Sequence, residues 1–504
     1  MARRVAVLWA VVVAGVVARV LWLDSLPGIN GDEAWYGVQV ATGSLALRTP
    51  TGNLVNPLHL APLAILQPFA PLAAWVLRAP AVLSGLVTLA LGYALLKRSL
   101  GAAAAVLFTA LAAASPDLIA YSRFGWDASG TPLVTLVALH LALSRRWVWA
   151  AVATGFAVVV HPTNALLAAP LAALFVAERS KDPPEKRRWV LYAGAVAAGA
   201  AVLGAALAAV VRFDVRAALG GIAPAPGETF LSMLSRYGEL LSGVTVYRYI
   251  AGPISPVASL AHGVALWCAV APAVALGCVR AWRDGERRPA ALAAGLVASL
   301  VALYAVFGTF PLTPGSERYG QFLVVPSLAL AAWSIAKLGE RRELAAFVAV
   351  IALSVVSLGC VGRFYFEPLR VDGGHSHRTF RIGSREPKVM VADAIRADRQ
   401  RGDVVLAEDW WTGVPLEYLL SRTRGVRVLR HVEGVAPAPP VVSALRAGGY
   451  VVGWHEGAFH RAIVENVPHA VVIDRVVLDR ARRPLLHLWR LRRPTDATRA
   501  TASR

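Results

Sequence analysis

The sequence predicts an all-α polytopic membrane protein that carries a soluble α/β domain at its C-terminal end. Of its 504 residues, 57% are hydrophobic and only 16% are charged. The apolar residues come in long runs separated by short charged clusters, as in helices that cross a bilayer with about 20 residues each. After residue 361 the long runs stop, and charged residues alternate with short apolar segments. These observations together predict the fold class.

The apolar runs predict about eleven membrane-spanning helices within residues 1–361. The first run follows two arginines and has the charge pattern of a signal peptide, but it is long enough to span and lacks an evident cleavage site. Residues 56–78 contain four prolines and are expected to lie at the membrane interface without crossing. Two short spans flank His161; the alternative is that this part of the chain forms one long kinked helix. The predicted spans are residues 5–23, 79–96, 101–119, 130–144, 147–160, 163–177, 189–211, 257–279, 290–308, 320–337 and 343–361.

The charge distribution predicts the orientation of these spans. Lysine and arginine number 51 against 31 aspartates and glutamates, which gives a formal net charge of +20. In the short loops, basic residues recur at every second loop, which is the pattern of cytoplasmic loops. We therefore expect a multi-pass plasma-membrane protein with a cytoplasmic N-terminus, an extracytoplasmic tail, membrane lipids as partners and no nucleic acid. The loops predicted to be cytoplasmic are residues 97–98, 144–146, 178–188, 280–288 and 337–343.

The tail is expected to divide into an α/β domain over residues 362–492 and a disordered basic end over residues 493–504. Trp410 and Trp411 are assigned to the core of this domain, with stacking on a sugar ring as the alternative. The predicted strands are residues 403–409, 426–431, 450–454 and 470–479, and the predicted helices are residues 387–400 and 457–467. All three cysteines fall within or at the ends of apolar runs, so no disulfide framework is expected.

The ionisable residues that could carry chemistry gather on the predicted outer side of the membrane, while the spans are almost free of them. An ion-coupled transporter would need acids, histidines or broken helices near the bilayer midplane. The observed distribution instead fits a site at the boundary between water and lipid. A flippase for a lipid-linked precursor and a non-catalytic scaffold are the alternatives. The clustered residues are Asp32, Glu33, Asp117, Arg123, Asp127, His161, Glu317 and Arg318.

Three stretches of the sequence resemble the GT-C glycosyltransferases that use polyprenyl-phosphate sugars, particularly protein O-mannosyltransferases and lipid A aminoarabinose transferases. They are Asp32-Glu33 followed by Tyr36, Arg78 with the stretch APAVLSGL, and the stretch SPDLIAYSRFGWDAS. The resemblance covers roughly residues 1–340. It implies an inverting enzyme that moves a mannose-type or arabinose-type monosaccharide from a polyprenyl-phosphate donor to a cell-envelope acceptor.

The resemblance also implies a role for the two adjacent acids and the arginines. Asp32 is the expected general base, which accepts the proton of the acceptor hydroxyl, and Glu33 is its binding or orienting neighbour. From the residues alone, a helix-capping turn explains both acids equally well. Arg123 and Arg318 are expected to hold the donor phosphate, with His161 as a further candidate. A surface ion pair for Arg123 and a hydrogen-bonded turn for His161 are the simpler alternatives.

The remaining candidates concern substrate and cofactor. Asp127, Tyr36 and Tyr319 are predicted to contact substrate, although Tyr319 would also serve as an interfacial aromatic anchor. Asn56 stands where the family commonly has a basic residue, so no phosphate contact is expected there. No cofactor is expected, because arginines can neutralise the leaving phosphate. A divalent cation held by Asp32 and Asp127 is the alternative.

Overall fold

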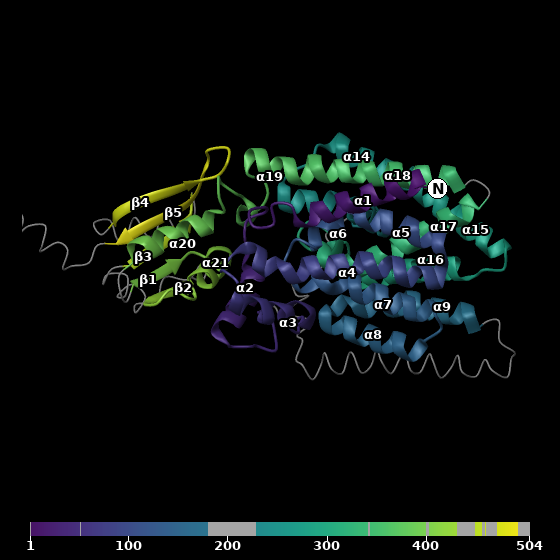
Figure 1. Cartoon of the computed structure of the whole chain (residues 1–504), viewed down its shortest axis with the longest axis horizontal. Coiled ribbons are helices and arrows are strands. Elements are labelled where there is room, and N and C mark those ends of the chain that lie inside the picture. The colour runs from purple at the N-terminus through teal and green to yellow at the C-terminus, as the bar shows by residue number, and fades with distance from the viewer. Residues whose placement is uncertain are drawn as a thin grey trace, which may run out of the picture.

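The computed structural model is a long helical bundle with a small sheet domain at one end (Figure 1). The N-terminus lies at the end of the bundle farthest from the sheet domain, and the helices run roughly along the long axis. This arrangement confirms the predicted fold class. The structure describes residues 2–50, 52–179, 228–340, 343–399, 403–430, 449–455, 459 and 471–491. The predicted span 189–211, the predicted helix 457–467 apart from Phe459, and the predicted basic end 493–504 lie outside these residues.

The helices of the bundle follow the predicted spans. Within the described ranges, five helical stretches are long and apolar enough to cross a membrane, and four shorter apolar helices accompany them. Among the described residues, the bundle includes α1 (Ala2–Val20), α4 (Ala74–Leu100), α5 (Ala102–Ala114), α6 (Pro116–Tyr121), α7 (Thr131–Leu143), α8 (Trp147–Val160), α9 (Ala168–Arg179), α12 (Phe230–Ser242), α14 (Pro256–Ala265), α15 (Ala271–Arg283), α16 (Arg288–Phe307), α17 (Val324–Gly339) and α18 (Glu343–Cys360).

Some helix ends differ from the prediction for identifiable reasons. The run predicted over residues 101–119 is divided, because Ser115 caps a new helix that has Pro116 in its first turn. The last helix of the bundle continues through a π-helical turn, Val361–Phe366, into α19 (Glu367–Asp372), beyond the predicted boundary at residue 361. The chain around His161 forms two helices joined by η3 (Pro162–Leu167), rather than one kinked helix.

The first outer segment forms α2 (Gly31–Thr42), α3 (Pro57–Leu66) and η1 (Gln67–Phe69), which lie between the bundle and the sheet domain (Figure 1). A capping box starts α2, since the Asn30 side chain accepts from the backbone N–H of Glu33 at 3.0 Å and the Glu33 carboxylate accepts from that of Asn30 at 3.1 Å. With ten residues, α3 is too short to span a bilayer, as expected for its part of residues 56–78. Residues 74–78 differ from that prediction, because they form the start of α4.

The tail domain is a five-stranded mixed sheet in the order β2-β1-β3-β5-β4. β1 runs parallel to β2 and β3, whereas β5 is antiparallel to β3 and β4. The four predicted strands are present, but β5 and α21 are elements that the sequence analysis did not predict. The elements are α20 (Pro387–Asp398), β1 (Asp403–Ala407), α21 (Trp410–Leu420), β2 (Val426–Arg430), β3 (Gly449–Trp454), β4 (Val471–Leu478) and β5 (Pro484–Leu491).

The tail domain and the first outer segment share one hydrophobic core. Ala34 and Tyr36 of α2 belong to the same buried cluster as Val405 of β1 and Tyr418 of α21. Hydrogen bonds also cross the boundary; for example, the Tyr418 hydroxyl donates to the carbonyl of Ala73 at 3.3 Å. The tail domain is therefore packed directly on the segment that carries Asp32.

Contacts between loops agree with the prediction that successive loops lie on alternate sides of the membrane. Arg145 pairs with Glu178 at 2.6 Å, and Arg288 pairs with the same carboxylate, which joins three loops that were all predicted to be cytoplasmic. On the other side, Arg318 pairs with Asp32. Which of the two ends faces the cytoplasm stays a prediction.

Candidate active site

Asp32 lies in the first turn of α2, where its carboxylate meets residues from two distant parts of the chain. Its Oδ2 accepts from Nη1 of Arg318 at 3.3 Å, and its Oδ1 accepts from the indole Nε1 of Trp410 at 3.1 Å. Arg318 belongs to η8 (Glu317–Leu323), and Trp410 is the first residue of α21. The side chains of Asp32 and Arg318 are 31% and 23% exposed, so both are accessible to a ligand. The structure thus brings two predicted site residues together and adds Trp410.

Glu33 points away from this group and is fully buried. Its carboxylate accepts from Arg78 at 2.7 and 3.0 Å and from the backbone N–H of Gly125 at 3.4 Å. Arg78 also donates to four backbone carbonyls of the turn that leads into α2. This two-point ion pair therefore holds the start of α2 in place. The geometry gives Glu33 an orienting role through the backbone, rather than a contact with substrate.

Arg123 does not face the Asp32 carboxylate. Its guanidinium is fully buried, lies 4.9 Å from the ring centroid of Phe366, and donates to four backbone carbonyls at the end of α1 and in the following turn, at 2.7 to 3.3 Å. Burial lowers the pKa of Arg123. Because both terminal nitrogens are occupied by the main chain, this geometry does not support the predicted phosphate contact. Arg123 instead ties α1 to the turn after α6.

Tyr319 packs against Arg318, and His161 packs against Tyr319. The guanidinium of Arg318 is 5.4 Å from the ring centroid of Tyr319, and the imidazole of His161 meets the same ring edge-on at 5.3 Å. His161 is 1% exposed, and its Nδ1 is 2.8 Å from the hydroxyl of Thr163. Its predicted direct contact with phosphate is therefore not supported. Instead, His161 supports Tyr319, which in turn supports Arg318.

The contacts that the structure describes for Tyr36 are with residues other than Asp32. The side chain of Asp127 is not described. Tyr36 is buried, its hydroxyl accepts from the backbone N–H of Asn56 at 3.5 Å, and its ring packs edge-on against His59 at 4.8 Å. Tyr36 therefore holds the chain that enters α3. Asp127 starts η2 (Asp127–Gly130), but its side chain lies outside the described residues, so its substrate contact stays a prediction.

A metal site is likewise left open. Within the ranges that the structure describes, no three or more histidine, cysteine, aspartate or glutamate side chains are grouped so that they could hold a metal ion. Asp32 reaches Arg318 and Trp410. Because the Asp127 side chain is not described, the alternative of a divalent cation between Asp32 and Asp127 is not tested.

Tyr249 is a neighbour of the site that the sequence analysis did not single out. It lies in the π-helical turn Tyr247–Ala251, and burial, with Glu317 and Asp32 nearby, raises the pKa of its hydroxyl. The hydroxyl therefore stays neutral and can donate a hydrogen bond at physiological pH. Gly315 permits this packing, because it has a φ of +90° and a Cβ there would lie 2.9 Å from the Tyr249 ring. The sequence offered only a tyrosine-rich stretch as a signal.

Trp410 has a contact that its assignment to the core of the tail domain did not include. Both tryptophans pack against the core that the tail domain shares with the first outer segment, and the ring of Trp411 lies 5.4 Å from that of His377. The Trp410 indole N–H in addition donates to Asp32. The core assignment therefore holds for both residues, and Trp410 also reaches the site.

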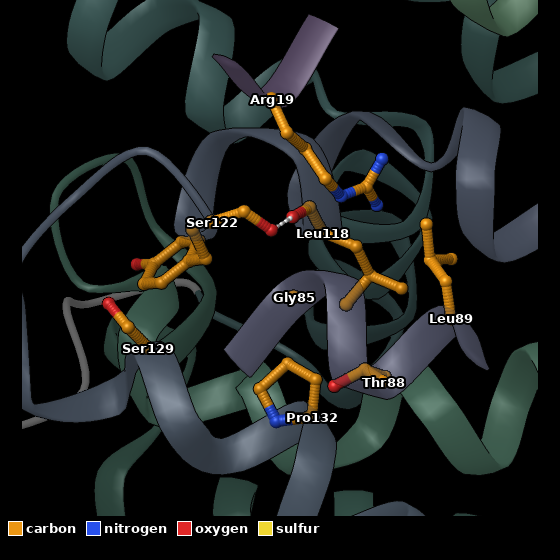
Figure 2. Close-up of a pocket in the computed structure, with 9 residues that line it drawn as sticks. Arg19, Gly85, Thr88, Leu89, Leu118, Ser122, Ser129 and Pro132 are labelled. Atoms are coloured by element: carbon orange, nitrogen blue, oxygen red, sulfur yellow. Dashed lines mark hydrogen bonds between the residues drawn. The ribbon is translucent and has the colours of Figure 1, made fainter. Parts of the chain in front are cut away.

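A small cavity lies inside the bundle, between α1, α4, α6 and the start of α7 (Figure 2). Its volume of about 10 Å³ is enough for one water and too small for a sugar. Arg19 and Ser122 border it, and the Ser122 hydroxyl donates to the carbonyl of Leu118 at 2.6 Å, as Figure 2 shows. Arg19 donates to three backbone carbonyls, two of them on α5, so this charged group of the first helix has a packing role.

Comparison with known proteins identifies the fold. Residues 63–211 match the family described as dolichyl-phosphate-mannose-protein mannosyltransferase, which is less than half of the chain. No curated protein sequence matches the chain significantly.

Two solved structures are similar over most of this chain. ArnT from Cupriavidus metallidurans bound to undecaprenyl phosphate matches with a TM-score of 0.52 and 15% identity, over 96% of this chain and 97% of that one. The Archaeoglobus fulgidus oligosaccharyltransferase in complex with Zn and sulfate matches with a TM-score of 0.51 and 15% identity, over 91% of this chain and 69% of that one. Similarity at this level of identity establishes the fold. The chain is therefore a membrane protein with the GT-C fold of these glycosyltransferases.

Proposed function

We propose that the protein is an inverting membrane glycosyltransferase that moves a mannose-type or arabinose-type monosaccharide from a polyprenyl-phosphate donor to a cell-envelope acceptor. The observation that carries this proposal is the accessible Asp32 carboxylate, held between Arg318 and Trp410 at the end of the bundle that bears the tail domain. The GT-C fold and the undecaprenyl phosphate bound to the similar ArnT structure support a lipid-phosphate donor.

The proposed reaction assigns one task to each accessible group. The acceptor oxygen attacks the anomeric carbon, and its proton passes to the Asp32 carboxylate. The bond between the anomeric carbon and the phosphate oxygen breaks, and the electron pair leaves with the polyprenyl phosphate. Arg318 stabilises the negative charge that remains on this phosphate. Attack from the side opposite to the leaving group inverts the configuration.

The ion pair between Asp32 and Arg318 suggests an order of binding. Arg318 pairs with the Asp32 carboxylate, which has to act as base. The donor phosphate is a diester with one negative charge, as the carboxylate has, but it offers two oxygens to the guanidinium fork, whereas Asp32 accepts one hydrogen bond from Arg318; it therefore competes with Asp32 for Arg318. Once Arg318 turns to the phosphate, its positive charge no longer stabilises the ionised Asp32 carboxylate, which then accepts a proton more readily. Donor binding before acceptor binding follows from this competition.

The test of the proposed function is a transfer assay with purified protein. Radiolabelled polyprenyl-phosphate sugars of several kinds are incubated with envelope extract and the protein, and the Asp32→Asn variant serves as the inactive control. Transfer that depends on Asp32 supports the proposal and identifies the sugar. Translocation of an intact lipid-linked precursor across vesicles, without transfer, would instead indicate a flippase.

A further inference from the structure

We infer that the tail domain completes the active site, with Trp410 as a positioning residue for the Asp32 carboxylate. This inference rests on the proposed function and deepens it. It begins from the hydrogen bond between the Trp410 indole N–H and Asp32, which joins residues 378 positions apart in the sequence.

The contacts of Trp410 place its indole tightly on the start of α2. Gly31 directly precedes Asp32, and a Cβ at Gly31 would collide with both Cδ1 and Nε1 of the Trp410 indole. Only glycine therefore allows the ring to come this close. The guanidinium of Arg430, on β2, lies 5.4 Å from the centroid of the Trp410 ring. The indole is thus held between α2 and the tail sheet rather than free in solvent.

The residue before Trp410 anchors the start of α21. The Asp409 carboxylate caps this helix by accepting from the backbone N–H of Thr412 at 2.8 Å. Its other oxygen accepts from the indole of Trp454 at 2.8 Å and from Arg378 at 3.1 Å. Three fixed partners leave Asp409 little freedom, so the N-terminus of α21 is a rigid support for Trp410.

The tail domain is also hydrogen-bonded to the segment that leads into α2. The backbone N–H of Gly28 donates to the carbonyl of Phe380 at 3.0 Å, and that of Ile29 donates to Glu386 at 3.2 Å. Lys388 pairs with Glu386 at 3.1 Å, and both side chains are buried. The two residues that lead into α2 are therefore bonded to the tail domain.

This geometry has a chemical consequence for the base. When Arg318 moves to the donor phosphate, the hydrogen bond from the Trp410 indole still orients Oδ1 of Asp32. An indole N–H is neutral, so it orients the carboxylate without the strong charge neutralisation that an arginine imposes.

The inference is tested with Trp410→Phe, which keeps the aromatic ring and removes the donor N–H. Trp411→Phe is the matched control, because Trp411 contacts His377 and the core instead of Asp32. We expect Trp410→Phe to lower kcat about 5-fold to 20-fold with donor KM within about twofold of the parent. Its acid limb in the pH–rate profile should move to higher pH, because the ionised carboxylate loses a hydrogen-bond donor. Trp411→Phe should leave the profile unchanged.

Two outcomes separate this inference from the proposed function. If Asp32→Asn abolishes transfer while Trp410→Phe keeps parental kcat and pH profile, Trp410 is not a positioning residue, yet the proposed base stands. If Asp32→Asn also retains turnover, the proposed function itself fails. To separate a change of fold from the loss of the hydrogen bond, melting temperatures are measured for Trp410→Phe and for Gly31→Ala, which displaces the indole, and kcat is compared between variants that melt like the parent. A loss of kcat in both variants without the shift in the pH profile would also overturn the positioning role.

Discussion

At the scale of single residues, the two adjacent acids of the first outer segment have separate roles. Asp32 is accessible and contacts Arg318 and Trp410, whereas Glu33 is fully buried against Arg78. Consecutive residues on a helix point about 100° apart, so one carboxylate can face the site while its neighbour faces the protein interior. Removal of each acid should therefore have a different effect.

We expect Asp32→Asn to lower turnover by roughly 10²-fold or more while donor affinity survives, because the amide keeps the shape but cannot accept a proton. Transfer rate and donor affinity are measured on the same folded, detergent-purified protein. Asp393→Asn, which alters a carboxylate paired with Arg385 and Arg396 on the tail surface, is the control. Near-parental turnover in Asp32→Asn would remove it as the base, and a larger loss in Asp127→Asn would transfer that role to Asp127.

We expect Arg318→Ala to weaken donor binding by about 1.5 to 3 kcal/mol, which is roughly 10-fold to 150-fold in Kd. Arg318→Lys should restore only part of this, because an ammonium lacks the planar fork. Arg123→Leu should lower the melting temperature and leave donor Kd unchanged, since Arg123 is bonded to the main chain. Binding is measured by titration with a polyprenyl phosphate in detergent. Parental affinity in Arg318→Ala would place the phosphate contact elsewhere.

At the scale of elements, the start of α2 depends on the buried pair of Glu33 and Arg78, which joins it to α4. Removal of one member leaves the other charge buried without its partner, which typically costs about 3 to 5 kcal/mol. We therefore expect Glu33→Ala to lower the unfolding temperature markedly, as measured in detergent, with Asp393→Asn as the control that changes little. A variant that melts like the parent but has lost turnover would instead give Glu33 a direct role in the reaction.

The segment that joins the tail domain to Gly28 should respond to pH. The Nδ1 of His377 accepts from the backbone N–H of Thr379 at 3.3 Å and caps η10 (Arg378–Phe380). Burial lowers the pKa of His377, with Arg378 adding to the effect. The unfolded state then takes up the proton first, so stability is complete above about pH 6.5 and falls as the pH drops below that value. Melting temperatures between pH 5 and 8 should show this loss, and His377→Asn, which caps without titrating, should reduce it. Identical slopes in both proteins would contradict the assignment.

At the scale of the whole molecule, the N-terminus and the tail domain lie at opposite ends of the bundle (Figure 1). With the N-terminus in the cytoplasm, the tail and Asp32 are extracytoplasmic, where a lipid-linked donor and an envelope acceptor can meet. This orientation follows from the basic loops and stays a prediction.

Cysteine labelling in whole cells checks the orientation. The native Cys268, Cys278 and Cys360 are first replaced by serine, since Cys268 is exposed. A cysteine at the exposed tail position 385 should react with an impermeant maleimide in intact cells, whereas one at position 284 should react only after permeabilisation. The reverse pattern would place Asp32 and the tail domain in the cytoplasm and remove the proposed site from the outer surface.

The sequence by itself determined the membrane class, the positions of most spans, the alternation of loops and the strand pattern of the tail. These features depend on the apolar periodicity and charge of a single stretch of sequence, and not on the segments that pack against it. The run at residues 147–160 became α8 with the same bounds, because nothing interrupts it. The missed β5 reads PLLHLWRL, in which the apolar residues do not alternate regularly with polar ones because both faces of the strand are largely buried.

Only the tertiary structure decided which of the candidate residues meet. Arg123 and Arg318 are equally plausible phosphate ligands in the sequence, yet one is enclosed by backbone carbonyls and the other reaches Asp32. Trp410 reaches the same carboxylate from 378 residues away, because the tail domain packs on α2. Such contacts depend on how whole elements pack. The sequence around each residue does not indicate which distant residue it will contact. The physical reason is that burial and hydrogen bonding between elements are properties of the assembled core, while helices and strands follow from the residues of one segment.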